Sequence, residues 1–350
     1  MAQSLAVKYR PKNWEDVTEQ EAVKVILQNQ LETGEIRHAY LFCGGAGTGK
    51  TTCARIFANE INKGQGNPIE MDAASNNSVE DIRTLSEQAK TRSLDSEYKI
   101  FILDECHSLS NSAWQAMLKL IEEPPAKTIF IFCTTDPQKI PKTILSRVQR
   151  YDFQRISQSG VVNRLHNILV SEQKEQYYNS GKPSDITYKG EALEYLAKIA
   201  DGGMRDAITM LDKCLAYSPE ISLDSVVEAL GVAEYSTMMR LTDYIHSRDK
   251  QKILEVVNAV HAAGKDLKQF IRQYLQFILD VCIYNTTKDI DTTSLPASGE
   301  MQEWLDRNAE YDVESIELMD MIVKLNTEIK WDPSPKMLIL SQFLLFTSEG

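Results

Sequence analysis

The sequence lacks any hydrophobic run long enough to cross a membrane. Its longest apolar-rich stretch, MLILSQFLLF, covers residues 337–346 and is about half of a bilayer span. The first residues, MAQSLAVKYRPKNW, contain no apolar segment of the kind found in signal peptides. With 350 residues, 43% apolar and 25% charged, the chain has the composition of a soluble globular protein of two or three domains. We therefore expect a cytoplasmic protein without membrane contacts.

The sequence also lacks paired cysteines and clustered histidines. No two cysteines form a C-x-x-C pair, and the five histidines are dispersed along the chain and do not form a group with the cysteines. This spacing indicates neither a disulfide framework nor a zinc knuckle, so we expect reduced cysteines in the core and no zinc. The six cysteines are Cys43, Cys53, Cys106, Cys133, Cys214 and Cys282.

A basic surplus is absent as well, because the formal net charge is −12. A protein that coats nucleic acid nonspecifically needs a cationic surface, so this class is disfavoured. The acidic excess is uneven. Residues 1–155 hold 19 Lys and Arg against 20 Asp and Glu, whereas residues 156–350 hold 19 against 30. If any part contacts DNA or RNA, we expect it to be the N-terminal part.

Short apolar runs alternate with amphipathic stretches between about residues 39 and 155. The runs AYLFC, KIFILDE and TIFIFCTT read as buried strands, and the alternation predicts a parallel α/β sheet covered on both faces. In the stretch SNSAWQAMLKLIEEPP, Ser112 and Gln115 predict a helix-capping box, and Pro124 and Pro125 predict the end of the helix. Short helices are expected over 157–232, and longer ones from 233 onward.

The strand AYLFC leads into a glycine-rich stretch, Gly44-x-x-x-x-Gly49-Lys50-Thr51, which matches the phosphate-binding P-loop pattern and opens a helix. Glycines let backbone N–H groups converge on phosphate oxygens, Lys50 reaches the β and γ phosphates, and Thr51 offers its hydroxyl to Mg²⁺. The alternative is a glycine-rich turn without a ligand. The residues expected to contact ATP here are Gly44, Gly45, Ala46, Gly47, Thr48, Gly49, Lys50, Thr51 and Thr52.

Two acids end the apolar strand KIFIL. We expect Asp104 to hold Mg²⁺ through water and Glu105 to orient and polarise the attacking water; the alternative is a pair of solvated acids in a turn. The next strand ends in Thr134 and Thr135. A hydroxyl there could contact the γ-phosphate or the water, or both could be ordinary strand-end threonines.

Taken together, several motifs over roughly residues 4–215 resemble the tau/gamma ATPase subunit of the bacterial DNA polymerase III clamp loader. They include YRPKNWEDV, GKTTCARIFA, EMDAASNNSVEDIR, FILDECHSLSNSAWQAMLKLIEEPP, CTTDPQKIPKTILSR and DGGMRDAITMLDK. The resemblance implies an AAA+ fold with a nucleotide domain at 1–156, a helical lid at 157–232 and a helical collar at 233–350.

The resemblance also implies roles for single residues. Asp104 and Glu105 match the acidic box, and Thr135 matches the first sensor. Arg147 matches the arginine finger, which would make it catalytic together with Glu105, Lys50 and Thr135, and Arg205 matches the second sensor. The residues expected against the base and phosphates from the N-terminal segment are Ala6, Arg10 and Pro11.

By the same resemblance, the collar joins subunits into a ring, pentameric in that family, which loads a sliding clamp onto primer–template DNA. Helix N-termini near Ser78 and Ser112, and basic side chains, could contact the DNA backbone. Most of these are equally compatible with solvated helix faces. The expected DNA-contacting residues are Arg83, Lys90, Arg92 and Ser112.

The chain departs from the family pattern in two places. Where members usually carry four zinc-binding cysteines, this chain has only NKGQGNPI. Val148 takes the place of a cysteine directly after Arg147. We expect no bound zinc and an intact arginine finger. The chain also stops where the collar would end. We therefore expect either a naturally short member of the family or a member whose C-terminal extension was removed.

The two arginines have different expected sites of action. Arg205 lies near the start of a predicted helix, where the dipole disfavours a cation unless an anion is bound; the alternative is a surface arginine paired with Asp201 or Asp206. Arg147 follows the last predicted strand by about a dozen residues. In this fold that distance carries it toward the far edge of the domain, so we expect it to serve a neighbouring subunit's nucleotide.

Two other functions stay open from the sequence. Another DNA-linked AAA+ ATPase, such as a branch-migration motor or a helicase loader, would share the fold. A clamp-loader scaffold that does not hydrolyse ATP would share the architecture. Lys50, Thr51, Asp104 and Glu105 are all present, which speaks against the scaffold.

Overall fold

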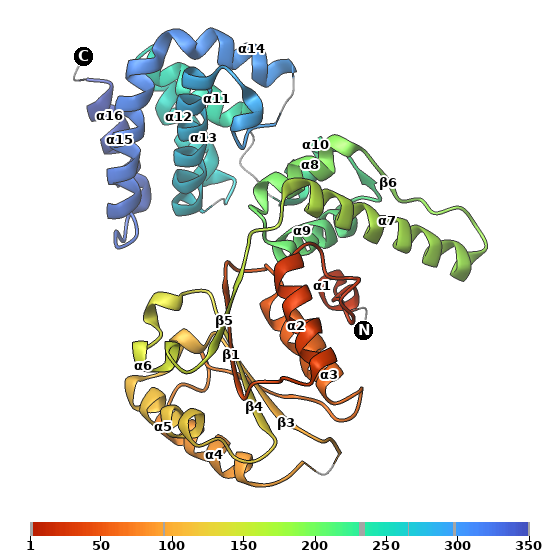
Figure 1. The fold of residues 1–350 in the computed structure, drawn as a ribbon. Coiled ribbons are helices and arrows are strands. Elements are labelled where there is room, and N and C mark those ends of the chain that lie inside the picture. Colours follow the sequence, from red (N-terminus) through yellow and green to blue (C-terminus); the bar gives the residue numbers. More distant parts are fainter. Residues whose placement is uncertain (1–2, 94, 231–234, 265, 297–298, 349–350) are drawn as a thin grey trace. The chain divides into compact units, whose positions relative to one another are not determined.

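The computed structural model divides into two compact units, residues 1–220 and residues 221–350 (Figure 1). The predicted boundary after residue 156 stays a prediction, and the predicted boundary between 232 and 233 lies outside the described residues. The structure describes residues 3–93, 95–230, 235–264, 266–296 and 299–348.

The first unit is built around a five-stranded parallel sheet, as the alternating pattern predicts. Its spatial order is β2-β3-β4-β1-β5, so β1 lies between β4 and β5. Parallel strands run in one direction, and their carboxyl ends therefore meet at one edge of the sheet. The strands are β1 (Ala39–Gly44), β2 (Ile69–Asp72), β3 (Lys99–Asp104), β4 (Thr128–Thr134) and β5 (Gln149–Phe153).

Helices cover both faces of this sheet. Alternate strand residues point to opposite faces, which gives two apolar layers. Phe101 and Phe130 pack under α4 and α5, whereas Ile102 and Ile131 pack under α2 and α3 (Figure 1). The helices of this region are α1 (Leu5–Lys8), α2 (Glu21–Thr33), α3 (Lys50–Ile61), α4 (Val79–Lys90), α5 (Asn111–Glu122) and α6 (Lys142–Leu145), with short 3-10 turns η1 (Cys106–Ser108) and η2 (Pro137–Lys139).

The start of α5 corrects one sequence prediction. The capping residue is Ser110, whose Oγ accepts a hydrogen bond from the Ala113 N–H at 3.2 Å, so the predicted cap at Ser112 is wrong by two residues. The Ser110 N–H donates to Asn77 O at 3.1 Å, and this bond helps to fix the extended backbone that a cap requires. The helix ends at Glu122, two residues before Pro124, as predicted.

Three helices follow the sheet. The first, α7, is 23 residues long and corrects the prediction of short helices. The last of its buried residues is Leu169. The second half of the helix is polar and lacks the helical spacing of apolar residues that would have predicted its length. The elements are α7 (Gln158–Ser180), α8 (Gly190–Ile199) and α9 (Met204–Tyr217), with the two-residue strands β6 (Thr187–Tyr188) and β7 (Glu220–Ile221).

The second unit is helical, as predicted. Its core surrounds α13, where the buried Tyr274 hydroxyl lies 2.9 Å from Thr242 Oγ1. Trp304 donates its indole N–H to Asp243 Oδ1 at 2.9 Å. The elements are α10 (Leu223–Leu230), α11 (Tyr235–His246), α12 (Lys250–Ala262), α13 (Leu267–Thr287), η3 (Ile290–Thr292), α14 (Gly299–Asn308), η4 (Ala309–Tyr311), α15 (Asp312–Glu328) and α16 (Pro335–Phe346).

All six cysteines are free thiols, and all but the half-buried Cys282 are buried. Burial raises the pKa of the Cys43 thiol to about 11, so the thiol stays protonated and unreactive at neutral pH. Within the described ranges, no group of three or more His, Cys, Asp or Glu side chains could share a metal ion. In the same part of the chain, no helix combines the length and apolar character needed to cross a bilayer.

We expect His246 to make the second unit sensitive to acid. Its Nδ1 lies 3.3 Å from Asn308 Oδ1 and its ring stacks on Tyr311, while Nε2 is buried without a partner among the described residues. Burial lowers the pKa of His246 below its ordinary value of 6.5. The unfolded chain then binds a proton that the folded unit resists, so stability should fall as the pH drops through about 6.5.

We expect acidification from about pH 7.5 to about pH 5.5 to destabilise α11 in the wild type more than in His246→Gln. The measurement is the free energy of opening from native-state hydrogen exchange of the α11 amides, corrected for intrinsic rates. His261→Gln, at an exposed position in α12, is the matched control and should behave like wild type. An equal pH dependence in all three proteins would contradict the prediction.

Candidate functional site

The glycine-rich loop sits between β1 and α3, in the strand–loop–helix context that the sequence predicts. Two glycines are required by close backbone approach. A Cβ on Gly44, which has φ of +154°, would lie 2.5 Å from the Phe153 carbonyl oxygen on β5. A Cβ on Gly47, which has φ of +71°, would lie 2.9 Å from the Cα of Gly203. Side chains at these positions would push the loop away from its neighbours.

Lys50 at the start of α3 is a buried cation held by its own loop. The residue is only 6% exposed. Its Nζ donates to Gly44 O at 3.0 Å and to Gly45 O at 2.7 Å. Burial lowers the pKa of the ammonium below its usual value. Neutral carbonyls are weaker partners for a cation than an anion, so the loop is suited to an anionic ligand.

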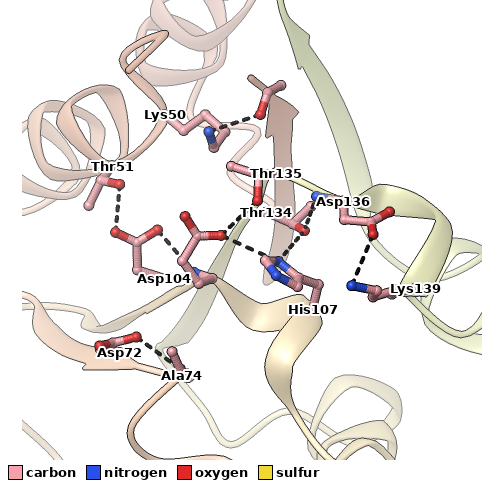
Figure 2. A network of polar contacts seen from close by, with 12 residues as sticks. Lys50, Thr51, Asp72, Ala74, Asp104, His107, Thr134, Thr135, Asp136 and Lys139 are labelled. Atoms are coloured by element: carbon pink, nitrogen blue, oxygen red, sulfur yellow. Dashed lines mark hydrogen bonds and ion pairs between the residues drawn. The ribbon is translucent and has the colours of Figure 1, made fainter. Parts of the chain in front are cut away.

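The acid that ends β3 faces the helix that follows the loop. Thr51 Oγ1 donates to Asp104 Oδ2 at 2.8 Å (Figure 2). The other carboxylate oxygen, Oδ1, accepts from the Glu105 N–H at 3.0 Å. A hydroxyl beside a carboxylate is an oxygen-only donor set, which is what Mg²⁺ prefers. These two residues therefore fit a magnesium ion that also touches a phosphate.

Glu105 is held by Thr135, the residue directly after β4, and by His107. Thr135 Oγ1 donates to Glu105 Oε2 at 3.0 Å, and His107 Nδ1 lies 3.3 Å from the same oxygen (Figure 2). Glu105 has φ of +47°, a left-handed conformation that is uncommon outside glycine. Thr134 is buried and accepts from the Asp136 N–H at 3.0 Å. Of the two threonines, Thr135 is the one that contacts the acid.

A cavity of about 320 Å³ lies over the loop and is lined by residues from five stretches of the first unit, within 6–18, 46–55, 104–105, 156–164 and 204–208. Gly44, Gly45, Thr135 and Arg147 are not among its lining residues. The predicted site residues that line it are Ala6, Arg10, Pro11, Ala46, Gly47, Thr48, Gly49, Lys50, Thr51, Thr52, Asp104, Glu105 and Arg205.

The N-terminal segment reaches this cavity because it is fastened to the helices that follow the sheet. The Leu5 N–H donates to Asp212 Oδ2 at 3.1 Å, and Arg164 Nη2 donates to Tyr9 O at 2.8 Å. The segment therefore presents Arg10 to the cavity. Burial, together with the positive charges of Arg55 and Arg205, lowers the pKa of Arg10 below its usual value. Cations lie close together here, and an anion would relieve their repulsion.

Arg205 lies in the first turn of α9 and lines the cavity. Asp201, one of the two acids considered as its partner, instead pairs with Arg155. Among the described residues no ion pair joins Arg205 to Asp201 or Asp206. The Met204 N–H donates to Gly47 O at 3.1 Å, so the start of α9 rests directly on the glycine-rich loop. This contact places a cation at a helix N-terminus, where an anion is favoured.

Arg147 follows α6 and lies outside the lining of the cavity. Its Nη2 forms an ion pair with Glu122 Oε1 at 2.8 Å, and Nη1 donates to Thr143 O at 2.8 Å. The residues predicted to contact DNA lie in or near α4 and α5, and Arg83 pairs with Glu80 at 3.0 Å. All of these residues are exposed: Arg83, Lys90, Arg92 and Ser112.

Several lining residues escaped the sequence analysis, above all Arg55, Tyr9 and Arg164. Arg55 forms an ion pair with Glu70, and its buried Nε has no partner among the described residues. Its spacing, four residues after Thr51, places both on one helical face and could have identified it. Arg164 lies in α7, and no sequence pattern connects that helix with the loop.

Three family models match successive parts of the chain. The model for the DNA polymerase III delta subunit matches residues 69–157. The model for the ATPase lid domain of a DNA polymerase III clamp loader subunit matches residues 182–220. The model for domain III of DNA polymerase III subunits gamma and tau matches residues 221–340.

Curated relatives agree with these matches. DNA polymerase III subunit tau of Bacillus subtilis is 34% identical over 96% of this chain and 61% of the relative, and that of Escherichia coli is 32% identical over 78% and 44%. Subunit gamma of Buchnera aphidicola from Schizaphis graminum is 28% identical over 96% and 95%. The chain thus spans less than two thirds of the two tau relatives.

The solved structures include the RuvB Holliday junction branch migration motor of Thermotoga maritima. It is 18% identical, with a TM-score of 0.52 over 74% of this chain and 86% of that one. At this identity the likeness shows the fold alone.

We expect Gly47→Ala to weaken binding of a nucleoside triphosphate by roughly tenfold, because its Cβ would separate the loop from Gly203. Gly34→Ala is the matched control, since Gly34 has φ of +72° and nothing within 4 Å of an added Cβ. The left-handed backbone alone should cost each variant roughly 1–2 kcal/mol of folding stability. Titration of a fluorescent nucleotide measures the affinity; equal affinities for the two variants would show that loop–lid contact is irrelevant to binding.

Proposed function

Because this chain belongs to the DNA polymerase III tau and gamma subunit family, we propose that it is an ATPase subunit of a replication clamp loader. It binds and hydrolyses ATP to open a sliding clamp and load it onto primer–template DNA. The observation that carries this proposal is the meeting of the glycine-rich loop, Asp104, Glu105 and Arg205 around one cavity. The division into nucleotide domain, lid and collar at 1–156, 157–232 and 233–350 belongs to the same proposal.

ATP phosphates bind to the loop amides and to Lys50, whose ammonium exchanges its two carbonyl partners for phosphate oxygens. Thr51 and Asp104 hold Mg²⁺, supported by their 2.8 Å contact. When bound, this ion neutralises charge on the phosphates. Arg10 contacts the nucleotide from the N-terminal segment, supported by its place in the cavity wall. The remaining contacts come from Ala6 and Pro11 of that segment and from Thr52.

Glu105 acts as the general base that orients and polarises the attacking water. Thr135 acts as a sensor, supported by its 3.0 Å hydrogen bond to Glu105. A threonine hydroxyl has a single O–H to donate. When Thr135 donates to the γ-phosphate or the water, it releases Glu105 Oε2, so ligand arrival and availability of the base are linked through one proton donor.

The two arginines act on different nucleotides. Arg205 closes over the phosphates of its own subunit, supported by its place in the cavity wall. Arg147 enters a neighbour's site in a ring that is pentameric by resemblance, supported by its exposed position outside the cavity of its own chain. Turnover then depends on assembly, because arginine fingers supplied in trans raise phosphoryl transfer by on the order of 10³-fold or more.

The partners in this proposal are other clamp-loader subunits, a sliding clamp and primer–template DNA. DNA backbone contacts come from Arg83, Lys90, Arg92 and Ser112, supported by their exposure in or near α4 and α5. A branch-migration motor or helicase loader would share the fold. The match to gamma and tau domain III favours the clamp loader. The complete set of Lys50, Thr51, Asp104 and Glu105 favours hydrolysis over a scaffold role.

We expect Glu105→Gln to bind ATP like wild type and to lose turnover by roughly 100-fold or more, because an amide cannot accept the proton of the water. Steady-state hydrolysis in the assembled complex with clamp and primer–template DNA measures the rate, and nucleotide titration measures the affinity. Glu35→Gln, at an exposed position, is the control. An undiminished rate in Glu105→Gln would remove this residue from the mechanism.

Arg147→Ala should lower ATP turnover of the assembled, DNA-stimulated complex by on the order of 10³-fold and leave the slow rate of isolated subunits unchanged. Arg150→Ala is the matched control, because Arg150 is exposed nearby and pairs with Asp152. Isolated subunits that hydrolyse ATP as fast as the complex, or a complex indifferent to Arg147→Ala, would contradict action in trans.

A further inference from the structure

Two consecutive residues before α2 have left-handed backbone conformations, although neither is glycine. Glu19 has φ of +56° and Gln20 has φ of +61°. Such conformations are uncommon outside glycine, persist only where their surroundings fix them, and cluster at functional positions. Both side chains contact residues 154–157, the connector between β5 and α7.

Gln20 joins this connector to the glycine-rich loop through one side-chain amide. Its Oε1 accepts from the Gln154 N–H at 3.1 Å, and its Nε2 donates to Gln154 O at 2.7 Å, so the amide pairs with both backbone groups of one residue, as a neighbouring strand would. Nε2 also contacts Thr48 O at 3.4 Å. Gln20 is only 8% exposed, so water cannot readily replace these partners.

Glu19 holds the other end of the connector, where α7 begins. Its Oε2 accepts from the Ser157 N–H at 3.1 Å, and Ser157 Oγ donates to the same carboxylate. Ser157 is the N-cap of α7 and accepts from the Gly160 N–H at 3.0 Å. A Cβ on Gly160 would lie 2.5 Å from Glu19 Oε1, so the carboxylate is packed against the first turn of the helix. A negative charge is favoured there by the helix dipole.

The connector also contacts the turn before α9. The Ile156 N–H donates to Gly202 O at 3.3 Å, and the Met204 N–H donates to Gly47 O at 3.1 Å. The contacts therefore form a closed path that runs from the loop through Gln20, the connector and this turn back to the loop. Arg205 directly follows Met204, so the position of its backbone depends on these contacts.

We propose that Glu19 and Gln20 are positioning residues that couple the glycine-rich loop to the placement of Arg205. The inference rests on the proposed function, because it assigns these residues to the site that takes ATP. A shift of the loop at Thr48 moves Gln20 and the connector, and the connector moves the turn that carries Arg205. Recognition of the γ-phosphate by Arg205 thereby depends on two residues that need not contact the nucleotide.

The central experiment uses Gln20→Asn in the full chain. Asparagine accepts the left-handed backbone and keeps an amide, but it is one methylene too short to span the gap. We expect the preference for a non-hydrolysable ATP analogue over ADP to fall about tenfold, with ADP affinity within about twofold of wild type. Gln28→Asn, on the exposed face of α2, is the matched control and should leave both affinities unchanged.

A double variant separates positioning from general loss of structure. If Gln20 acts through Arg205, adding Arg205→Ala to Gln20→Asn should reduce the preference no further than Arg205→Ala alone. The proposal would be overturned if the losses of preference from the two single variants multiply in the double variant. It would also be overturned if Gln20→Asn lowers the affinities for ADP and the analogue equally.

Amide hydrogen exchange without nucleotide tests the contacts themselves. Gln20→Asn should speed exchange at Gln154 and Met204, and Glu19→Gly, which suits the backbone but removes the carboxylate, should speed exchange at Ser157. Wild-type rates in both variants would refute the coupling. A wild-type chain that binds no ATP would refute the proposed function instead, and this second measurement would still decide whether the coupling exists.

Discussion

The parallel pairing of β3, β4 and β1 is the constraint on which the site depends. Because β1 lies beside β4 and β4 beside β3, the glycine-rich loop, the acid pair and Thr135 all follow carboxyl ends at one edge of the sheet. The register is fixed by two apolar layers, since a slip of one residue would turn every strand side chain to the opposite face. Packing beneath the helices thus sets the distance between Asp104 and Thr51.

The buried and closely spaced cations around the cavity favour an anionic ligand. Lys50 is buried against neutral carbonyls, and Arg10, Arg55 and Arg205 lie close enough for their charges to lower the pKa of Arg10. This repulsion is a cost that the folded chain bears until an anion arrives. A ligand that binds only the folded state shifts the folding equilibrium toward it, so occupancy and stability of this region are linked.

Local signals in the sequence were sufficient to predict much of this arrangement. The strand KIFILD and the loop around Lys50 could be read from apolar runs and glycine spacing, because each is encoded by neighbouring residues. The cap of α5 could not, because a contact with the distant Asn77 favours Ser110 over Ser112. The full length of α7 lacked an apolar period. Gln20 was missed because its role arises only when Thr48 and Gln154, far apart in sequence, meet in the fold.

The facing glycines at 47 and 203 also restrict which sequences can inherit this architecture. A methyl group on Gly47 would lie 2.9 Å from the Cα of Gly203, so neither partner has spare volume to offer in exchange. Most packed pairs tolerate a large-for-small swap because one side chain can shrink while the other grows. Here the partner at 203 is already at the minimum, so a side chain gained at position 47 has no compensating change at position 203.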